Sequence, residues 1–108
     1  MQTFSRTTLI GYLGADPVTQ EVGGKKKTEF QVATNYLAKN DQGEKEQEAE
    51  WHNIELWGRE NVLAYLKKGT PIWIEGYNKT SSWEKDGIKR NKTVVVVEEL
   101  GLLDSKKP

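Results

Sequence analysis

The chain has no cysteine, which excludes disulfides, thiol nucleophiles and zinc–sulfur sites together. It has a single histidine, and the acidic residues of 44–50 lack the Asp-rich spacing of a calcium loop. The segment GYLG (11–14) lacks the lysine and the spacing of a phosphate-binding loop. With so few groups suited to catalysis, we expect a protein that is not an enzyme and that uses no metal and no cofactor.

Long hydrophobic runs are also missing. The longest aliphatic run, Val94–Val97, is far too short to cross a bilayer. The first segment, MQTFSRTTLIGYLG, contains no continuous apolar core of signal-peptide length. A soluble, cytoplasmic protein is therefore expected.

The chain has no net charge, because 16 basic residues balance 16 acidic ones. The pI of about 6.6 differs from the basic character that usually marks a nucleic-acid-binding domain. The charges are unevenly spread, however, with an acidic excess over residues 39–50 and a basic excess over residues 79–92. Such runs are ordinarily solvated surface, so by themselves they indicate no partner.

The 108 residues predict one domain, residues 1–103, with a short flexible C-terminal end at 104–108. Alternating apolar residues and turn signals predict a strand-rich chain. The expected strands are 7–14, 28–36, 50–58, 70–83 (bent near Gly76) and 91–100. The expected connections are a glycine-containing loop at 22–27, a polar loop at 39–48 and a hairpin turn at Asp86-Gly87.

One helix is predicted between the third and fourth strands. Val62, Leu63 and Leu66 have helical spacing, and Gly69 follows as a C-terminal stop. We place this helix near Arg59–Lys68. Five strands with one helix in this position match the OB-fold, a small Greek-key barrel that binds oligonucleotides or oligosaccharides. Other small β-barrels and α+β domains could show the same order; the fold class that we predict is all-β, a five-stranded OB barrel.

The segment EWHNIELWG (50–58) places large aromatics on an unusual side of its strand. Alternation puts Trp51 and Trp57 on the face with Asn53 and Glu55, opposite the apolar face that holds Ile54. Exposed apolar surface usually marks a binding site or an interface. Single-stranded nucleic acid suits it, because any base can stack on a tryptophan ring.

Several segments occur in the order found in bacterial-type single-stranded DNA-binding proteins: GYLGADP, FQVAT, EWHNIELWG, YLKKGTPIWIEG and SSW…DG…T. The chain resembles this family over about residues 5–98. The resemblance implies an OB-fold that binds single-stranded DNA on aromatic platforms during replication, recombination or repair. It also implies a homotetramer, built as a dimer of dimers, and association with the nucleoid. The product of an organelle genome is the alternative source.

The resemblance also implies roles for individual residues. Three family stacking positions fall at Trp51, Trp57 and Trp83. The fourth falls at Ala38, where Tyr36 is the nearest replacement. The basic residues expected to contact phosphates are Arg6, Lys79, Lys89, Arg90 and Lys92. The residues expected at contacts between subunits are His52, Trp73 and Glu75.

The chain departs from the family at other places too. The loop after the second strand is acidic where DNA is expected to pass. Ser81 and Ser82 occupy positions where family members usually have basic residues. The sequence ends at LLDSKKP, whereas family members generally continue into an acidic tail that recruits replication and repair proteins, so the sequence is a truncated form, a short member or a divergent relative. Two alternatives keep the fold. One is an assembly factor similar to primosomal replication protein, a dimeric tail-less relative, and the other is a single-stranded RNA binder.

Overall fold

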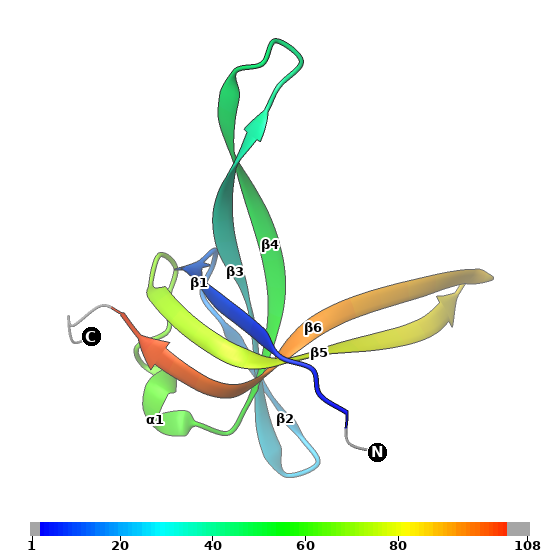
Figure 1. Ribbon diagram of the computed structural model, residues 1–108. Coiled ribbons are helices and arrows are strands. Elements are labelled where there is room, and N and C mark those ends of the chain that lie inside the picture. Colours follow the sequence, from blue (N-terminus) through cyan, green and yellow to red (C-terminus); the bar gives the residue numbers. More distant parts are fainter. Residues whose placement is uncertain (1–2, 104–108) are drawn as a thin grey trace.

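The computed structural model describes residues 3–103 and consists mainly of antiparallel strands (Figure 1). The expected C-terminal end, residues 104–108, lies outside this range. The elements follow one another as β1 (Thr7–Leu13), β2 (Val18–Val22), β3 (Lys25–Lys39), β4 (Lys45–Trp57), α1 (Glu60–Leu63), β5 (Pro71–Lys85) and β6 (Ile88–Leu102). Across these described residues, no helix has the length and hydropathy needed to cross a bilayer.

Five of the strands close into a barrel. Antiparallel ladders join β1 to both β3 and β5, and also join β3 to β4 and β5 to β6. A short parallel pairing between β4 and β6, at Ile54↔Val95 and Glu55↔Val96, completes the ring. The short β2 extends the sheet beside β3. This closed arrangement, with α1 between β4 and β5, confirms the predicted OB barrel.

The core is formed by the inward-facing alternate residues of the barrel strands. Ile72 and Ile74 of β5 are fully buried, as is Val32 of β3. Ile54 and Leu56 of β4 are also buried, which confirms the apolar face assigned to this strand. Because successive side chains point to opposite faces, Trp51 and Trp57 lie on the outer side of the barrel wall.

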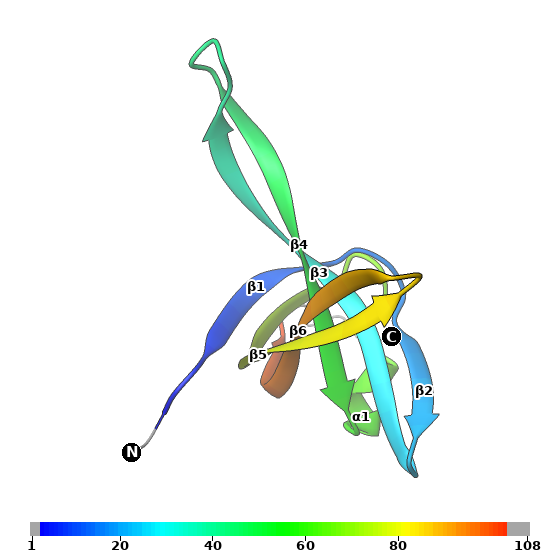
Figure 2. The same cartoon turned by 90° about the vertical axis from the view of Figure 1, so that its right-hand side faces the viewer.

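The two long hairpins continue past the barrel as separate arms. The β3–β4 arm comprises residues 34–50, and the β5–β6 arm comprises residues 79–93. Figures 1 and 2 show the two arms diverging from the barrel in different directions. At the tip of the second arm, Asp86 (φ 54°) and Gly87 (φ 77°) both have left-handed backbone, as a type I′ hairpin turn requires. The hairpin predicted there is confirmed.

Three local predictions were wrong. The polar loop predicted at 39–48 is only a short turn at 40–44, because β3 extends to Lys39 and β4 begins at Lys45. The helix is a single turn, Glu60–Leu63, shorter than the predicted Arg59–Lys68. Its N-cap, Arg59, has left-handed backbone and makes no side-chain capping bond, so little local energy favours a longer helix. The predicted loop at 22–27 is a tight turn at Gly23-Gly24, both with positive φ, between paired strands β2 and β3. Glycine adopts this conformation without steric cost.

Candidate nucleic-acid interface

One outer face of the β3–β4 ladder carries two of the predicted stacking residues. Directly paired residues of antiparallel strands point to the same side. The pairs on this side are Lys27↔Trp57, Glu29↔Glu55, Gln31↔Asn53 and Ala33↔Trp51. We call these eight residues the platform face. The tryptophans stand at its two ends, with charged and amide side chains between them.

Small neighbours make room for the Trp51 ring. Ala33 lies directly opposite Trp51 on β3. The ring lies against Gly14, where any Cβ would overlap the ring atoms. The Trp51 side chain remains 51% exposed, so its outer surface is accessible to a planar ligand.

Trp57 is more constrained than Trp51. It is half-buried, and its indole Nε1 donates a hydrogen bond to Oε2 of Glu55 at 3.0 Å. The ammonium group of Lys27 lies 6.0 Å from the ring centroid, within the range of a cation–π interaction. These contacts fix the orientation of the ring at the barrel end of the platform face.

The acidic segment of the β3–β4 arm points away from Trp51. Glu46, Glu48 and Glu50 pair with Ala38, Tyr36 and Thr34, on the alternate side of the ladder. The Trp51 side of the arm, over residues 33–39 and 45–51, carries no carboxylate. Alternation therefore separates the acidic surface from the platform face within one hairpin.

Tyr36 lies on the same side of the β3–β4 ladder as the glutamates, and not on the side of Trp51. Its hydroxyl donates to Oε2 of Glu48 at 2.9 Å, and this hydrogen bond raises the pKa of the Tyr36 phenol. Leu37, which the sequence analysis did not select, is on the Trp51 side and is 67% exposed. Strand alternation could have predicted this position, because Leu37 is four residues after Ala33, which lies opposite Trp51.

The β5–β6 arm separates its residues in the same way. The side that holds Trp83 is strongly basic, and among the described residues of the arm it has no carboxylate. Its pairs are Lys79↔Val94, Ser81↔Lys92, Trp83↔Arg90 and Lys85↔Ile88. Lys85 was not predicted and belongs to this side, whereas Lys89 lies on the other side, opposite Glu84. The structure thus groups Lys79, Arg90 and Lys92 with Trp83 and separates Lys89 from them.

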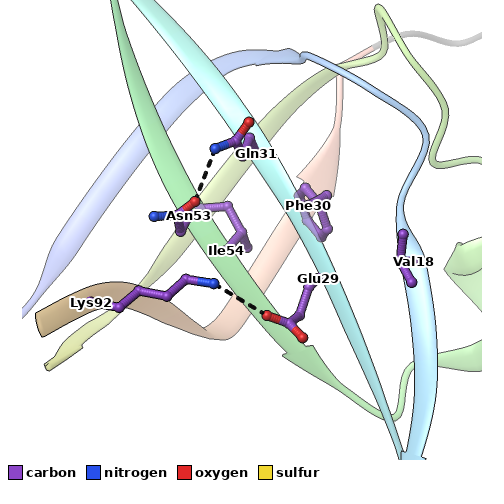
Figure 3. Close-up of a pocket in the computed structure, with 7 residues that line it drawn as sticks. All are labelled: Val18, Glu29, Phe30, Gln31, Asn53, Ile54 and Lys92. Carbon is purple, nitrogen blue, oxygen red and sulfur yellow. Dashed lines mark hydrogen bonds and ion pairs between the residues drawn. The ribbon is translucent and has the colours of Figure 1, made fainter. Parts of the chain in front are cut away.

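The basic side of the β5–β6 arm is continuous with the platform face. Lys79 Nζ lies 3.9 Å from Oε2 of Glu55, and Lys92 Nζ lies 3.7 Å from Oε2 of Glu29. Figure 3 shows Lys92 reaching Glu29 across an open hollow of about 330 Å³, beside the hydrogen-bonded amides of Gln31 and Asn53. The three predicted tryptophan platforms therefore border one connected surface.

The residues expected between subunits lie elsewhere on the barrel. His52 is half-buried on the side of the ladder opposite Trp51, and its Nε2 is 3.0 Å from Oγ1 of Thr34. Trp73 is half-buried on the outer face of β5, paired with the exposed Ile10 of β1.

Arg6, which was expected to contact phosphates, is engaged in another way. The Arg6 guanidinium lies 3.4 Å from Oε1 of Glu75. The structure thus brings Arg6 to a residue expected at a subunit contact. Among the described residues no cluster of side chains suitable for a metal ion is found.

An OB barrel that exposes tryptophans beside basic side chains has the features of single-stranded nucleic-acid-binding domains. The profile of the single-strand binding protein family matches residues 4–103, and the chain belongs to this family. The resemblance noted from the sequence is thereby confirmed.

Two curated relatives carry the name single-stranded DNA-binding protein 1. The relative from Chlorobaculum tepidum is 36% identical over 107 residues, an alignment that covers 94% of this chain and 66% of the relative. The relative from Xylella fastidiosa is 36% identical over 111 residues, covering 98% of this chain and 82% of the relative. The chain thus spans about two thirds of the length of the first relative.

Two solved structures share the fold. One is described as the Plasmodium falciparum SSB complex with ssDNA, with a TM-score of 0.85 and 25% identity, covering 96% of this chain and 98% of that chain. The other is a deletion mutant of the single-stranded DNA-binding protein from Thermus aquaticus, with a TM-score of 0.79 and 27% identity, covering 95% of this chain and 52% of that chain.

Proposed function

We propose that the protein binds single-stranded DNA with little sequence preference, by stacking bases on Trp51, Trp57 and Trp83. The observation that carries the proposal is the connected surface on which the platform face meets the basic side of the β5–β6 arm. Family membership and the names of the relatives support DNA as the ligand. They also support the prediction that the protein is not an enzyme.

Stacking explains how a chain without net charge can bind a polyanion. Each base stacked on an aromatic side chain contributes about 1–3 kcal/mol and requires no particular sequence. The basic side chains then need only follow the phosphates. In this role the protein would cover single strands exposed during replication, recombination or repair, close to the nucleoid.

Titration with oligo(dT) should strongly quench the tryptophan fluorescence. The affinity should depend only weakly on salt. For a single strand, the logarithm of the binding constant falls with the logarithm of the salt concentration by a slope of about −0.7 per neutralised phosphate. The Trp83 side of the arm offers Lys79, Lys85, Arg90 and Lys92, which together would contribute a slope of about −3 for each subunit. Titrations of oligo(dT) and oligo(U) at two salt concentrations measure both quantities. Absence of quenching by oligo(dT) would contradict the proposal, and tighter binding of oligo(U) would favour RNA as the ligand.

We also propose that the protein assembles as a homotetramer, a dimer of dimers. The outer side of β1 and β5 supports this, because Ile10 and Tyr12 are 63% and 54% exposed there and lie opposite Trp73 and Pro71. Contiguous exposed apolar surface of this kind is usually covered by a partner.

Substitution of His52 with tyrosine should loosen the assembly at low protein concentration. The larger ring loses the contact with Thr34 and needs space on the face where a second subunit is expected. Light scattering over a dilution series measures the change. Gln47→Tyr, which adds the same ring at an exposed position farther along β4, is the control and should leave the mass unchanged. A parent protein that is entirely monomeric at micromolar concentration would refute the proposed tetramer.

A further inference from the structure

Two carboxylates lie in the middle of the platform face, between the tryptophans. Glu29 and Glu55 are paired directly across β3 and β4. Lys27 Nζ lies 3.7 Å from Oε1 of Glu29 and 3.6 Å from Oε1 of Glu55. Lys79 adds a contact to Glu55 at 3.9 Å, and Lys92 adds one to Glu29 at 3.7 Å. We call these five side chains the central cluster.

Glu55 is the least accessible member of the cluster. Its side chain is 8% exposed, and a buried carboxylate is tolerated only when it is paired and hydrogen-bonded. Two lysines and the indole N–H of Trp57 supply these partners. The positive charge of Lys27 and Lys79 is therefore already partly neutralised by the Glu55 carboxylate. A phosphate that approaches Lys27 or Lys79 must compete with this carboxylate.

The cluster places negative charge where a nucleic-acid backbone would pass. Lys79 and Lys92 have side chains that are 53% and 46% exposed, so both can turn toward a ligand. They can do so only by weakening their contacts with Glu55 and Glu29. Stacking of a base on the exposed Trp51 ring breaks no ion pair, whereas a phosphate contact with Lys27, Lys79 or Lys92 weakens an ion pair with Glu29 or Glu55.

We propose that Glu29 and Glu55 are specificity-determining residues, which make binding depend on exposed bases and thereby disfavour double-stranded DNA. The inference rests on the proposed function of the platform face. In a duplex the bases are stacked inside the helix, so a duplex can bind this surface only through its phosphates. A single strand also gains the stacking energy. Carboxylates that weaken the phosphate contacts therefore penalise the duplex more than the single strand, as repulsive elements do in other specific interfaces.

Glu29→Gln and Glu55→Gln test this inference, because each removes one negative charge with almost no change in shape. The substituted glutamine at position 55 still has an oxygen that can accept the Trp57 hydrogen bond. The probes are a labelled oligo(dT) and a blunt DNA duplex of the same length, titrated by anisotropy at two salt concentrations. Glu60→Gln is the matched control, because it breaks an ion pair with Lys26 at 2.9 Å that lies outside the platform face.

The affinity for the duplex should rise more than the affinity for oligo(dT), so that their ratio increases by about threefold or more for each substitution. The duplex salt slope should become steeper by about 0.9 for each lysine released to a phosphate. Glu60→Gln should leave the ratio unchanged. Equal gains for both probes, or no gain beyond that of Glu60→Gln, would overturn the inference.

The two proposals fail in different ways. A wild-type protein that does not bind oligo(dT) refutes the proposed function, and with it the inference. A wild-type protein that binds oligo(dT) normally leaves the comparison of ratios to decide the inference alone. Thermal melting shows whether each variant is folded. If the Glu55→Gln variant unfolds, Glu29→Gln decides the inference. The Glu29 side chain is 35% exposed, so loss of its charge should leave the protein folded.

Discussion

Replacement of Trp51 with alanine should weaken the binding of oligo(dT) by about 1–3 kcal/mol, a factor of roughly 5 to 150 in affinity. The ring stands at the outer end of the platform face, packed on Gly14 and half exposed to solvent. Its removal takes away a stacking surface but opens no cavity in the core, where Ile54 and Val32 remain packed. Fluorescence or anisotropy titration measures the loss, and thermal melting checks the fold.

Trp51→Phe is the matched control, since it keeps an aromatic ring of smaller area at the same position. It should retain more of the affinity than Trp51→Ala. If Trp51 were instead a core residue, its truncation would lower the free energy of unfolding by about 3–5 kcal/mol. A variant with that loss of stability, whose folded fraction binds oligo(dT) normally, would contradict the stacking role.

Substitution of Ile74 with alanine should lower the free energy of unfolding by about 2–5 kcal/mol. Ile74 is fully buried in β5 and lies opposite Leu9 of β1, in the ladder that helps to close the barrel. Truncation removes buried apolar surface and leaves a cavity that the closed barrel cannot readily collapse. Urea unfolding followed by tryptophan fluorescence measures the effect.

Ile88→Ala is the control for this experiment. Ile88 is 55% exposed at the tip of the β5–β6 arm, so the same change of side chain should alter stability by no more than about 0.5 kcal/mol. Equal effects of the two substitutions would mean that the barrel interior is not the main source of stability.

Local patterns in the sequence predicted the strands and turns from which the barrel is built. Alternation at Ile54 and Leu56, and at Ile72 and Ile74, identified the buried faces of β4 and β5. The Asp86-Gly87 pair identified a hairpin turn, because few other residues adopt left-handed backbone at both positions. Gly76 marked a bend, and the β5–β6 register does shift between Glu75 and Gly76. Each of these signals depends on neighbours in the chain.

The arrangement of the site depends on register, which local patterns do not specify. Tyr36 and Lys89 have the side chains expected at a DNA surface, but the ladders place them on the sides that hold Glu48 and Glu84. The contacts of Glu55 with Lys27 and Lys79 join three different strands. Since one residue of slippage would reverse every side chain of a strand, such contacts could not be read from the sequence before the pairing was known.

The parallel seam between β4 and β6 has a consequence for how the protein folds. The two arms are hairpins of neighbouring strands, and isolated hairpins form within about 1–10 μs. The seam joins Ile54 to Val95 and Glu55 to Val96, residues separated in the chain by α1, β5 and the first part of β6. Loop-closure entropy must be overcome before such distant contacts contribute any stability. We therefore expect closure of the ring at this seam to be a late step of folding, and Lys79 and Lys92 to reach Glu55 and Glu29 of the platform face only when that step is complete.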